Sequence, residues 1–149
     1  MSSGLPEGLR FRLLHVGVAV PEIGAATEMF GSLFGSKVVS GPFDDPIQKV
    51  TVNFLTQTST PDADAAEVEL ISPLTADAPI QALLKKTGGG AYHLCFETNH
   101  LERALEHLRK QRCLVVSAPA PAVAFEGRRI AWLYTPSRIL VELVEGSEA

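Results

Sequence analysis

Apolar and polar positions alternate along this chain with two different periods. Short, β-branched stretches predict strands, and apolar residues spaced three and four apart predict helices. In the first half this pattern predicts a helix at 23–35, ended by Gly35, and strands at 11–20, 37–40, 49–56 and 67–74. Apolar positions on the expected inner face of that helix are Ala26, Met29, Phe30, Leu33 and Phe34, and those of the third strand are Val50, Val52 and Phe54.

The second half repeats this order of elements. The pattern predicts a helix at 99–113 and strands at 92–98, 114–117, 128–135 and 139–145. Asn99 and Glu102 are suitably spaced to cap the helix. Within the first half we expect a polar loop at 57–66, between its last two strands, and between the halves a short linker helix that ends in three glycines, within 76–90.

The spacing of particular residues indicates a true internal repeat. His15 and His93 each lie inside a strand that precedes a helix, and they are 78 positions apart. Phe54 and Trp132 are also 78 apart, whereas "VELI" and "VELV" are 73 apart, which requires a last loop five residues shorter in the second half. Each half is therefore predicted to be a βαβββ module, too small to bury its sheet well alone.

Composition limits the class of protein. The 149 residues are 46% hydrophobic with a formal net charge of −4, which argues against bulk binding of nucleic acid or of an anionic membrane. No apolar stretch approaches the roughly 18–20 residues of a membrane span, and the N-terminus does not resemble a signal peptide. Cys95 and Cys113 lack metal or redox spacing, so we expect a cytoplasmic protein.

The repeat also selects four candidate metal ligands. It places a histidine in each first strand and a glutamate in each last strand: His15, Glu69, His93 and Glu142. A lone strand histidine is usually a core or surface residue, and a glutamate in "VEL" can be the outward position of a strand, but repetition at equivalent positions favours ligands. Two imidazoles and two carboxylates suit one divalent ion with two open positions, such as Co²⁺, Mn²⁺, Ni²⁺, Fe²⁺ or Zn²⁺. His100 and His107, on the second helix, are expected in solvent.

Three segments resemble the vicinal oxygen chelate superfamily. They are "LLHVGVAVPEI", "VELISPLTADAPIQALLKKTGGGAYHLCFET" and "RRIAWLYTPSRILVELVE". The superfamily includes glyoxalase I, extradiol dioxygenases, antibiotic resistance proteins and methylmalonyl-CoA epimerase, and the epimerase group is the most similar. The resemblance covers about 12–145, and the family's metal ligands fall on the same four residues.

The resemblance implies a fold and a division of the chain. The expected class is α+β, with two tandem βαβββ modules that form a mixed eight-stranded sheet curled around a metal-binding cleft. A single domain, 1–149, would contain module one at about 10–75, the linker helix at 76–90 and module two at about 91–146. Chains of this superfamily usually pair, so we expect a homodimer.

Three features depart from the family pattern. Tyr92 stands where relatives carry a second histidine beside the ligand. The final turn, "YTPSRIL", is shorter and lacks the family's lysine and glycine. The third strand offers Gln48, Thr51 and Asn53 but no carboxylate, where some members place a catalytic glutamate.

The implied activity is metal-dependent epimerisation by proton abstraction next to a carbonyl. The substrate would be methylmalonyl-CoA or a similar acyl thioester. Glu142, with Glu69, is expected to act as both ligand and proton carrier, and Gln48 or a bound water would supply the other side. Basic residues that could meet the anionic part of a CoA are not assigned this role: Lys49, Lys85, Lys86 and Arg138.

Other functions of the same fold stay open. A glyoxalase I-like lyase uses a similar ligand set. A non-catalytic binding or resistance protein is disfavoured because such members often lack the ligands. An extradiol dioxygenase is disfavoured because a fourth protein ligand would leave too little room for oxygen.

Overall fold

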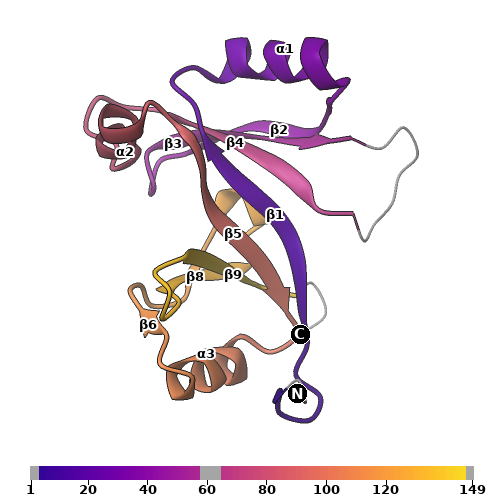
Figure 1. Cartoon of the computed structure of the whole chain (residues 1–149), viewed down its shortest axis with the longest axis vertical. Coiled ribbons are helices and arrows are strands. Elements are labelled where there is room, and N and C mark those ends of the chain that lie inside the picture. Colours follow the sequence, from indigo (N-terminus) through magenta and orange to yellow (C-terminus); the bar gives the residue numbers. More distant parts are fainter. Residues whose placement is uncertain (1–3, 58–64, 147–149) are drawn as a thin grey trace. The chain divides into compact units, whose positions relative to one another are not determined.

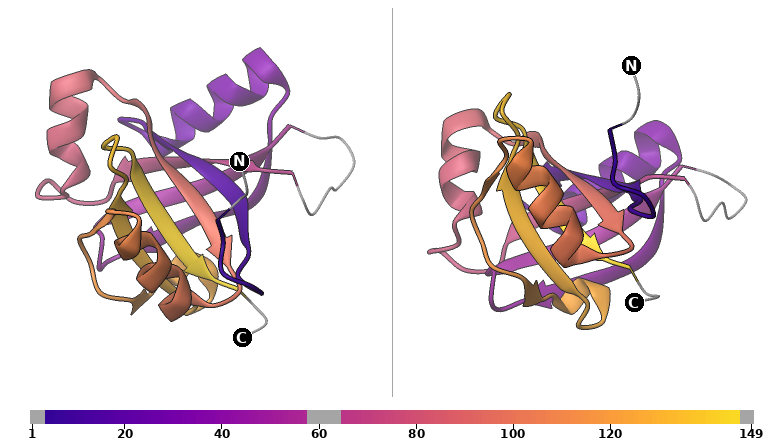
Figure 2. Two further views of the ribbon diagram at one scale, coloured as in Figure 1. Left: turned by 60° about the horizontal axis from the view of Figure 1, so that its bottom comes forward. Right: turned by 90° about the horizontal axis from the view of Figure 1, so that it is seen from below.

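The computed structural model describes residues 4–57 and 65–146, and its strands and helices are labelled in Figure 1, with two further views in Figure 2. The chain divides into two units, each described by itself below. We call residues 15–92 the first unit, and residues 4–14 with 93–146 the second unit. None of the helices in the described ranges is long and apolar enough to cross a membrane.

The elements of the first unit follow the predicted βαβββ order. Its bounds are β1 (Phe11–Ala19, of which 15–19 belong here), α1 (Ile23–Phe34), β2 (Lys37–Asp45), β3 (Val50–Thr56), β4 (Glu67–Pro73) and the linker helix α2 (Ile80–Thr87). The strands are ordered β2-β3-β4-β1; β1 runs parallel to β4 and the other pairs are antiparallel.

Helix α1 covers one face of this sheet. Ala26 packs in a buried cluster with Val20, Leu55 and Leu70, and Phe30 lies against it. The helix ends where predicted, because Gly35 adopts a left-handed conformation with φ 71° and its N–H reaches the carbonyl of Gly31.

The predicted inner face of α1 is only partly correct. Met29, Leu33 and Phe34 are 47%, 64% and 60% exposed, so the helix packs through its first turns and leaves its last turn in solvent. Strand β3 is buried on both faces rather than one. Its Asn53 is buried as well, and its amide donates a hydrogen bond to the Thr27 hydroxyl of α1.

The second unit repeats the arrangement around another helix. Its elements are β5 (Gly90–Thr98, of which 93–98 belong here), α3 (Leu101–Lys110), β6 (Leu114–Val115), β7 (Ala120–Pro121), the 3-10 helix η1 (Val123–Phe125), β8 (Arg129–Tyr134) and β9 (Leu140–Glu145). The strands are ordered β5-β9-β8-β6, with β7 also on β8; β5 and β9 are parallel. Helix α3 packs its apolar side on β8 and β9 through Leu101, Ala104, Leu105, Leu133 and Leu143.

The α+β class and the repeated module are confirmed. Nine strands occur among the described residues, one more than predicted, because β7 was not recognised in the proline-containing stretch before η1. The difference in loop length is also confirmed: residues 57–66 join β3 to β4, whereas residues 135–139 join β8 to β9. Most of the expected polar loop at 57–66 lies outside the described residues.

The predicted capping pair of α3 is wrong. The N-cap residue is His100, whose Nδ1 accepts a hydrogen bond from the Arg103 N–H at 3.3 Å. The Asn99 side chain instead holds the N-terminal segment: it accepts from the Arg10 N–H and donates to the Gly8 carbonyl. Glu102 turns to Arg129, an ion pair that sequence spacing does not reveal. His107 is half-buried and lies against the Phe11 ring rather than fully in solvent.

Two glycines at the start of β5 provide a test of backbone packing: Gly89 precedes the strand and Gly90 is its first residue. Gly89 and Gly90 have similar left-handed φ values of 116° and 114°, but a Cβ on Gly89 would lie 2.6 Å from the Ala19 carbonyl oxygen, while nothing lies within 4 Å of one on Gly90. We expect Gly90→Ala to lower the free energy of unfolding by roughly 1–2 kcal/mol through φ strain alone. Gly89→Ala should cost about 2 kcal/mol more because the strand must shift. Urea unfolding of both variants measures this, and equal losses would contradict it.

The second unit carries an ion-pair network that predicts a pH dependence. Hydrogen bonds from the Arg129 side chain lower the pKa of Glu145, and the same guanidinium lowers the pKa of Glu102. A carboxyl group whose pKa is lowered by folding stabilises the protein at pH values above its ordinary pKa. This stabilisation is lost as the pH falls through its pKa in the folded protein. Glu145→Gln should therefore lower the urea midpoint most near pH 7 and least near pH 2.5, roughly.

A matched control for this network lies on α3. Glu106 pairs with Lys110 at 3.2 Å, and both side chains are largely exposed. Glu106→Gln should change the urea midpoint little at either pH, because exposed pairs contribute little. If Glu145→Gln lowered the urea midpoint equally at both pH values, the stabilisation by Glu145 would not come from its ion pair.

Candidate metal centre

The first unit contains one buried histidine–glutamate pair. His15 Nε2 lies 2.9 Å from Glu69 Oε1, and both side chains are almost fully buried. The strand register explains the contact: β4 is parallel to β1 with Glu69 level with Gly17, so Glu69 and His15 stand two positions apart on the same face. That face is opposite the one covered by α1, because Val68 and Leu70, the neighbours of Glu69, pack toward the helix.

The second unit contains the equivalent pair. His93 Nε2 lies 3.4 Å from Glu142 Oε1, again with both side chains buried. Strand β9 is parallel to β5 and places Glu142 level with Cys95, two positions from His93. Here too the pair occupies the sheet face opposite the helix, because Val141 and Leu143 pack in the α3 cluster.

An aromatic ring accompanies each pair. In the first unit Phe54 is the cross-strand partner of Glu69, and its ring meets His15 edge-on with centroids 5.5 Å apart. In the second unit Trp132 is the cross-strand partner of Glu142, and its ring meets His93 edge-on at 4.9 Å. The sequence shows that these two aromatic residues are 78 positions apart, like the two histidines, but it did not predict that each ring would contact a histidine.

The donor chemistry of each pair suits a divalent transition metal. An imidazole nitrogen and a carboxylate oxygen face one another in a dry surrounding, where each group needs a partner to offset its desolvation. Two such pairs would supply the mixed N and O ligands that Co²⁺, Ni²⁺, Zn²⁺ and related ions accept.

The other predicted site residue lies elsewhere in the first unit. Gln48 is in the turn between β2 and β3, two residues before β3 begins, and its N–H donates to Asp45 Oδ1 at 3.1 Å. The next residue in sequence, Lys49, is one of the candidate cations. It is paired with Asp77, and this lysine lowers the pKa of Asp77 to about 2. Among the other basic candidates, Arg138 lies in the β8–β9 turn: it adopts a left-handed φ of 67°, and its N–H donates to the Thr135 carbonyl.

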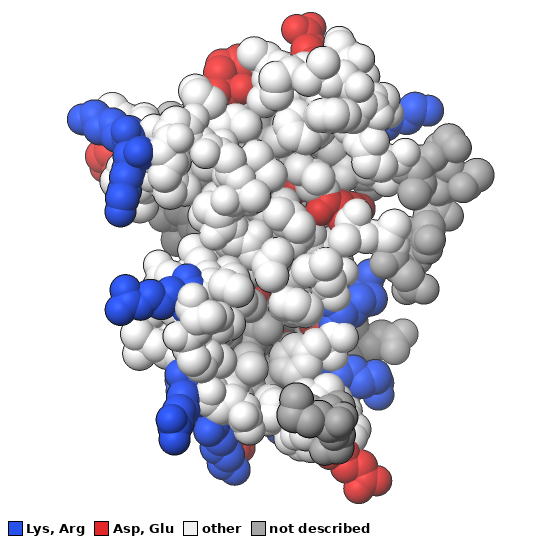
Figure 3. Space-filling model, viewed as in Figure 1, with Lys and Arg blue, Asp and Glu red and all other residues white. Residues whose placement is uncertain are grey.

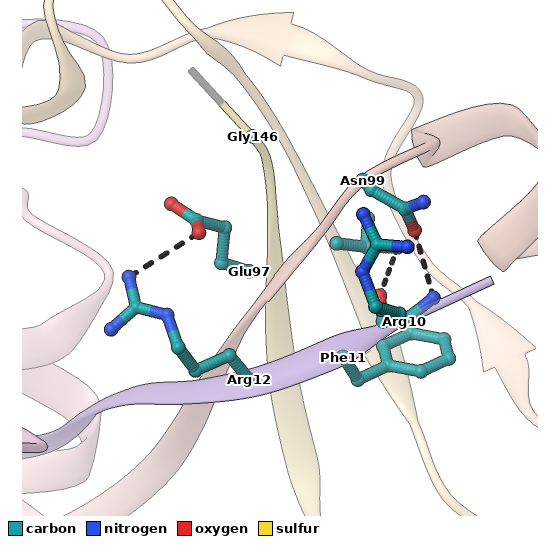
Figure 4. Close-up of a pocket in the computed structure, with 7 residues that line it drawn as sticks. Arg10, Phe11, Arg12, Glu97, Asn99 and Gly146 are labelled. Atoms are coloured by element: carbon teal, nitrogen blue, oxygen red, sulfur yellow. Dashed lines mark hydrogen bonds and ion pairs between the residues drawn. The ribbon is translucent and has the colours of Figure 1, made fainter. Parts of the chain in front are cut away.

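A cavity of about 490 Å³ lies in the second unit, between the start of β1 and the end of β5 (Figure 4). Its charged groups are mutually engaged: Glu97 accepts from both Arg12 and Arg128. The Asn99 side chain accepts a hydrogen bond from the Arg10 N–H, as described above. On the face drawn in Figure 3, Lys and Arg side chains are spread over several places rather than gathered at one. We assign no ligand to this cavity.

Each unit has the βαβββ order of elements and a buried His–Glu pair on the sheet face opposite its helix, and each pair offers ligand atoms that could bind a metal. The sequence profile of the glyoxalase/bleomycin resistance protein/dioxygenase superfamily matches residues 14–132. The chain belongs to this superfamily, which confirms the resemblance found in its sequence.

Within the superfamily, several of the proteins it resembles are named as epimerases. Ethylmalonyl-CoA/methylmalonyl-CoA epimerase of Cereibacter sphaeroides is 32% identical over 124 residues, which cover 83% of this chain and 87% of that protein. The crystal structure of methylmalonyl-CoA epimerase from Mycobacterium tuberculosis is 26% identical, with a TM-score of 0.78 over 91% of this chain and 88% of that one. A Streptomyces coelicolor methylmalonyl-CoA epimerase variant in complex with 2-nitronate-propionyl-CoA is 26% identical, with a TM-score of 0.76 over 91% and 97%.

Proposed function

We propose that this protein is a metal-dependent epimerase of methylmalonyl-CoA or a closely similar acyl-CoA. The observation that carries the proposal is the duplicated, buried His–Glu pair, one in each unit at equivalent strand positions. Relatives named as methylmalonyl-CoA epimerases over most of the chain support the substrate class. The complex of one such relative with an acyl-CoA analogue supports a CoA thioester as the small-molecule partner.

The four ligands of the proposal are His15, Glu69, His93 and Glu142, and each offers one ligand atom. All four are at most 5% exposed, so their charges are not offset by water. A single divalent ion shared by both pairs would neutralise both carboxylates and keep both histidines in the neutral form that binds metal. The ion is proposed to be Co²⁺, Mn²⁺, Ni²⁺ or Zn²⁺.

The bound ion would polarise the thioester carbonyl and stabilise the negative charge that develops on its oxygen. The chain's own residues then move the proton. We assign the role of proton carrier to Glu142, together with Glu69, because β3 presents no carboxylate. The imidazoles of His15 and His93 hold these carboxylates in orientation.

The second proton position is assigned to Gln48 or a bound water. A direct role for Gln48 requires the β2–β3 turn to approach the ligand pairs. Gln48 precedes β3, and the strand from Val50 to Phe54, the partner of Glu69, already spans about 13 Å. The two glutamates therefore carry the proposed chemistry, and Gln48→Ala tests the remaining assignment by its effect on kcat.

Two further parts of the proposal concern the setting of the enzyme. We infer that it works in the cytoplasm, which agrees with two free cysteines among the described residues. We also infer that two copies pair as a homodimer. Sedimentation equilibrium of the purified chain measures this directly.

Metal stoichiometry tests whether the two pairs act as one centre. We expect one ion per chain, and we expect both His15→Ala and His93→Ala to lower metal affinity at least about 100-fold, because each removes a ligand from the same ion. His107→Ala, on α3, should leave affinity unchanged. Elemental analysis with chelator competition measures these values. Two ions per chain, or one ion surviving undiminished in His15→Ala, would contradict a shared centre.

Exchange in deuterated water tests the reaction. With methylmalonyl-CoA, the metal-loaded protein should introduce deuterium at the α-carbon, followed by NMR. Glu142→Gln should keep the fold and slow this exchange by about 100-fold or more, the usual contribution of a positioned acid–base group. Glu106→Gln is the surface control.

The outcomes of the exchange experiment separate the candidate functions. Full exchange by a metal-loaded Glu142→Gln would show that this glutamate is not the proton carrier. Bound metal without exchange would favour a glyoxalase I-like lyase, and the absence of bound metal would favour a small-molecule binding protein.

A further inference from the structure

Each buried histidine is in contact with an aromatic ring placed by the same strand register. The glutamate of the pair, Glu69 or Glu142, stands directly across the ladder from Phe54 or Trp132. The ring therefore projects on the same face as the glutamate and reaches the histidine beside it. Both contacts are edge-on, at 61° in the first unit and 81° in the second.

This arrangement limits the motion of the imidazole. A histidine ring turns easily about its last side-chain bond, and only one orientation directs Nε2 to the carboxylate. An aromatic ring that meets it edge-on favours that orientation, because such contacts depend on the angle between the rings. Groups that orient a metal-binding histidine strongly affect metal affinity even though they do not touch the ion.

We propose that Phe54 and Trp132 are positioning residues that fix His15 and His93 for metal binding, one in each unit. This inference rests on the proposed function, and it adds residues that do not themselves bind the ion. The two units arrive at the same arrangement with different rings, phenylalanine at 4% exposure and a half-buried tryptophan. The same edge-on contact therefore occurs at equivalent positions in both units although the two aromatic residues differ.

The second unit also provides a spectroscopic reporter. Trp132 is the only tryptophan in the chain, and its ring lies 4.9 Å from the ring of His93. Because metal–nitrogen bonds are about 2 Å long, an ion on His93 would lie within roughly 10 Å of the indole. Co²⁺ should therefore quench the intrinsic fluorescence in a saturable 1:1 titration, and Zn²⁺ should displace it and restore the emission.

The decisive variants remove the rings while keeping an apolar side chain. Trp132→Leu and Phe54→Leu should each weaken Co²⁺ binding by about tenfold and change the visible absorption spectrum of the bound Co²⁺. Trp132→Phe, which restores a ring, should return affinity to within about threefold of the natural chain. Tyr134→Leu is the matched control, since Tyr134 lies on β8 two residues from Trp132 and is 40% exposed. Thermal unfolding of the metal-free variants shows which of them fold.

The outcomes distinguish this inference from the proposed function. If the natural chain binds Co²⁺ but Trp132→Leu and Phe54→Leu bind it with the same affinity and spectrum, the positioning role is wrong and the metal centre stands. If Trp132→Phe fails to recover what Trp132→Leu loses, the ring contact is not the cause and the role is again wrong. If the natural chain binds no ion, the proposed function fails and this inference fails with it.

Discussion

The structure depends on two buried pairs, each formed by an imidazole and a carboxylate on neighbouring parallel strands. Burial of a carboxylate is costly unless a charge or a hydrogen bond offsets it, and His15 and His93 provide that partner at 2.9 Å and 3.4 Å. Loss of one member of such a pair leaves the other uncompensated, at a cost of about 3–5 kcal/mol. The surrounding sheet must therefore hold both members in register.

In each unit one face of the sheet packs against the helix, and the opposite face carries the buried His–Glu pair. In the first unit α1 packs on Leu55 and Leu70, and in the second unit α3 packs on Leu133 and Leu143. Because side chains alternate along a strand, the residues next to these leucines point to the opposite face. Those residues are Phe54, Glu69, Trp132 and Glu142. A shift of one residue in the register would exchange core and site, so the apolar packing under each helix also fixes the position of the ligands.

The sequence was sufficient for the features that repeat. Equal spacing between His15 and His93 revealed the module, and the shorter β8–β9 loop followed from arithmetic alone. Features that depend on contacts distant in sequence were not predictable. Asn99 has the composition of a helix cap, yet it binds Gly8 and Arg10, some 90 residues away. The apolar residues in the last turn of α1 are predicted to be buried from their spacing. They are exposed because helical periodicity cannot show how far the sheet extends beneath the helix.

The departures noted in the sequence leave the four residues of the buried pairs unchanged. Tyr92 precedes His93, the β8–β9 turn contains Arg138 with a left-handed φ of 67°, and Asn53 of β3 is bonded to Thr27 of α1. The pairs themselves, and the rings beside them, are retained in both units. Asn53 lies on the face of β3 that α1 covers, opposite the face of Phe54 and Glu69. Because the strand register fixes the buried pairs and the rings beside them, residues outside this register can differ without moving the proposed ligands.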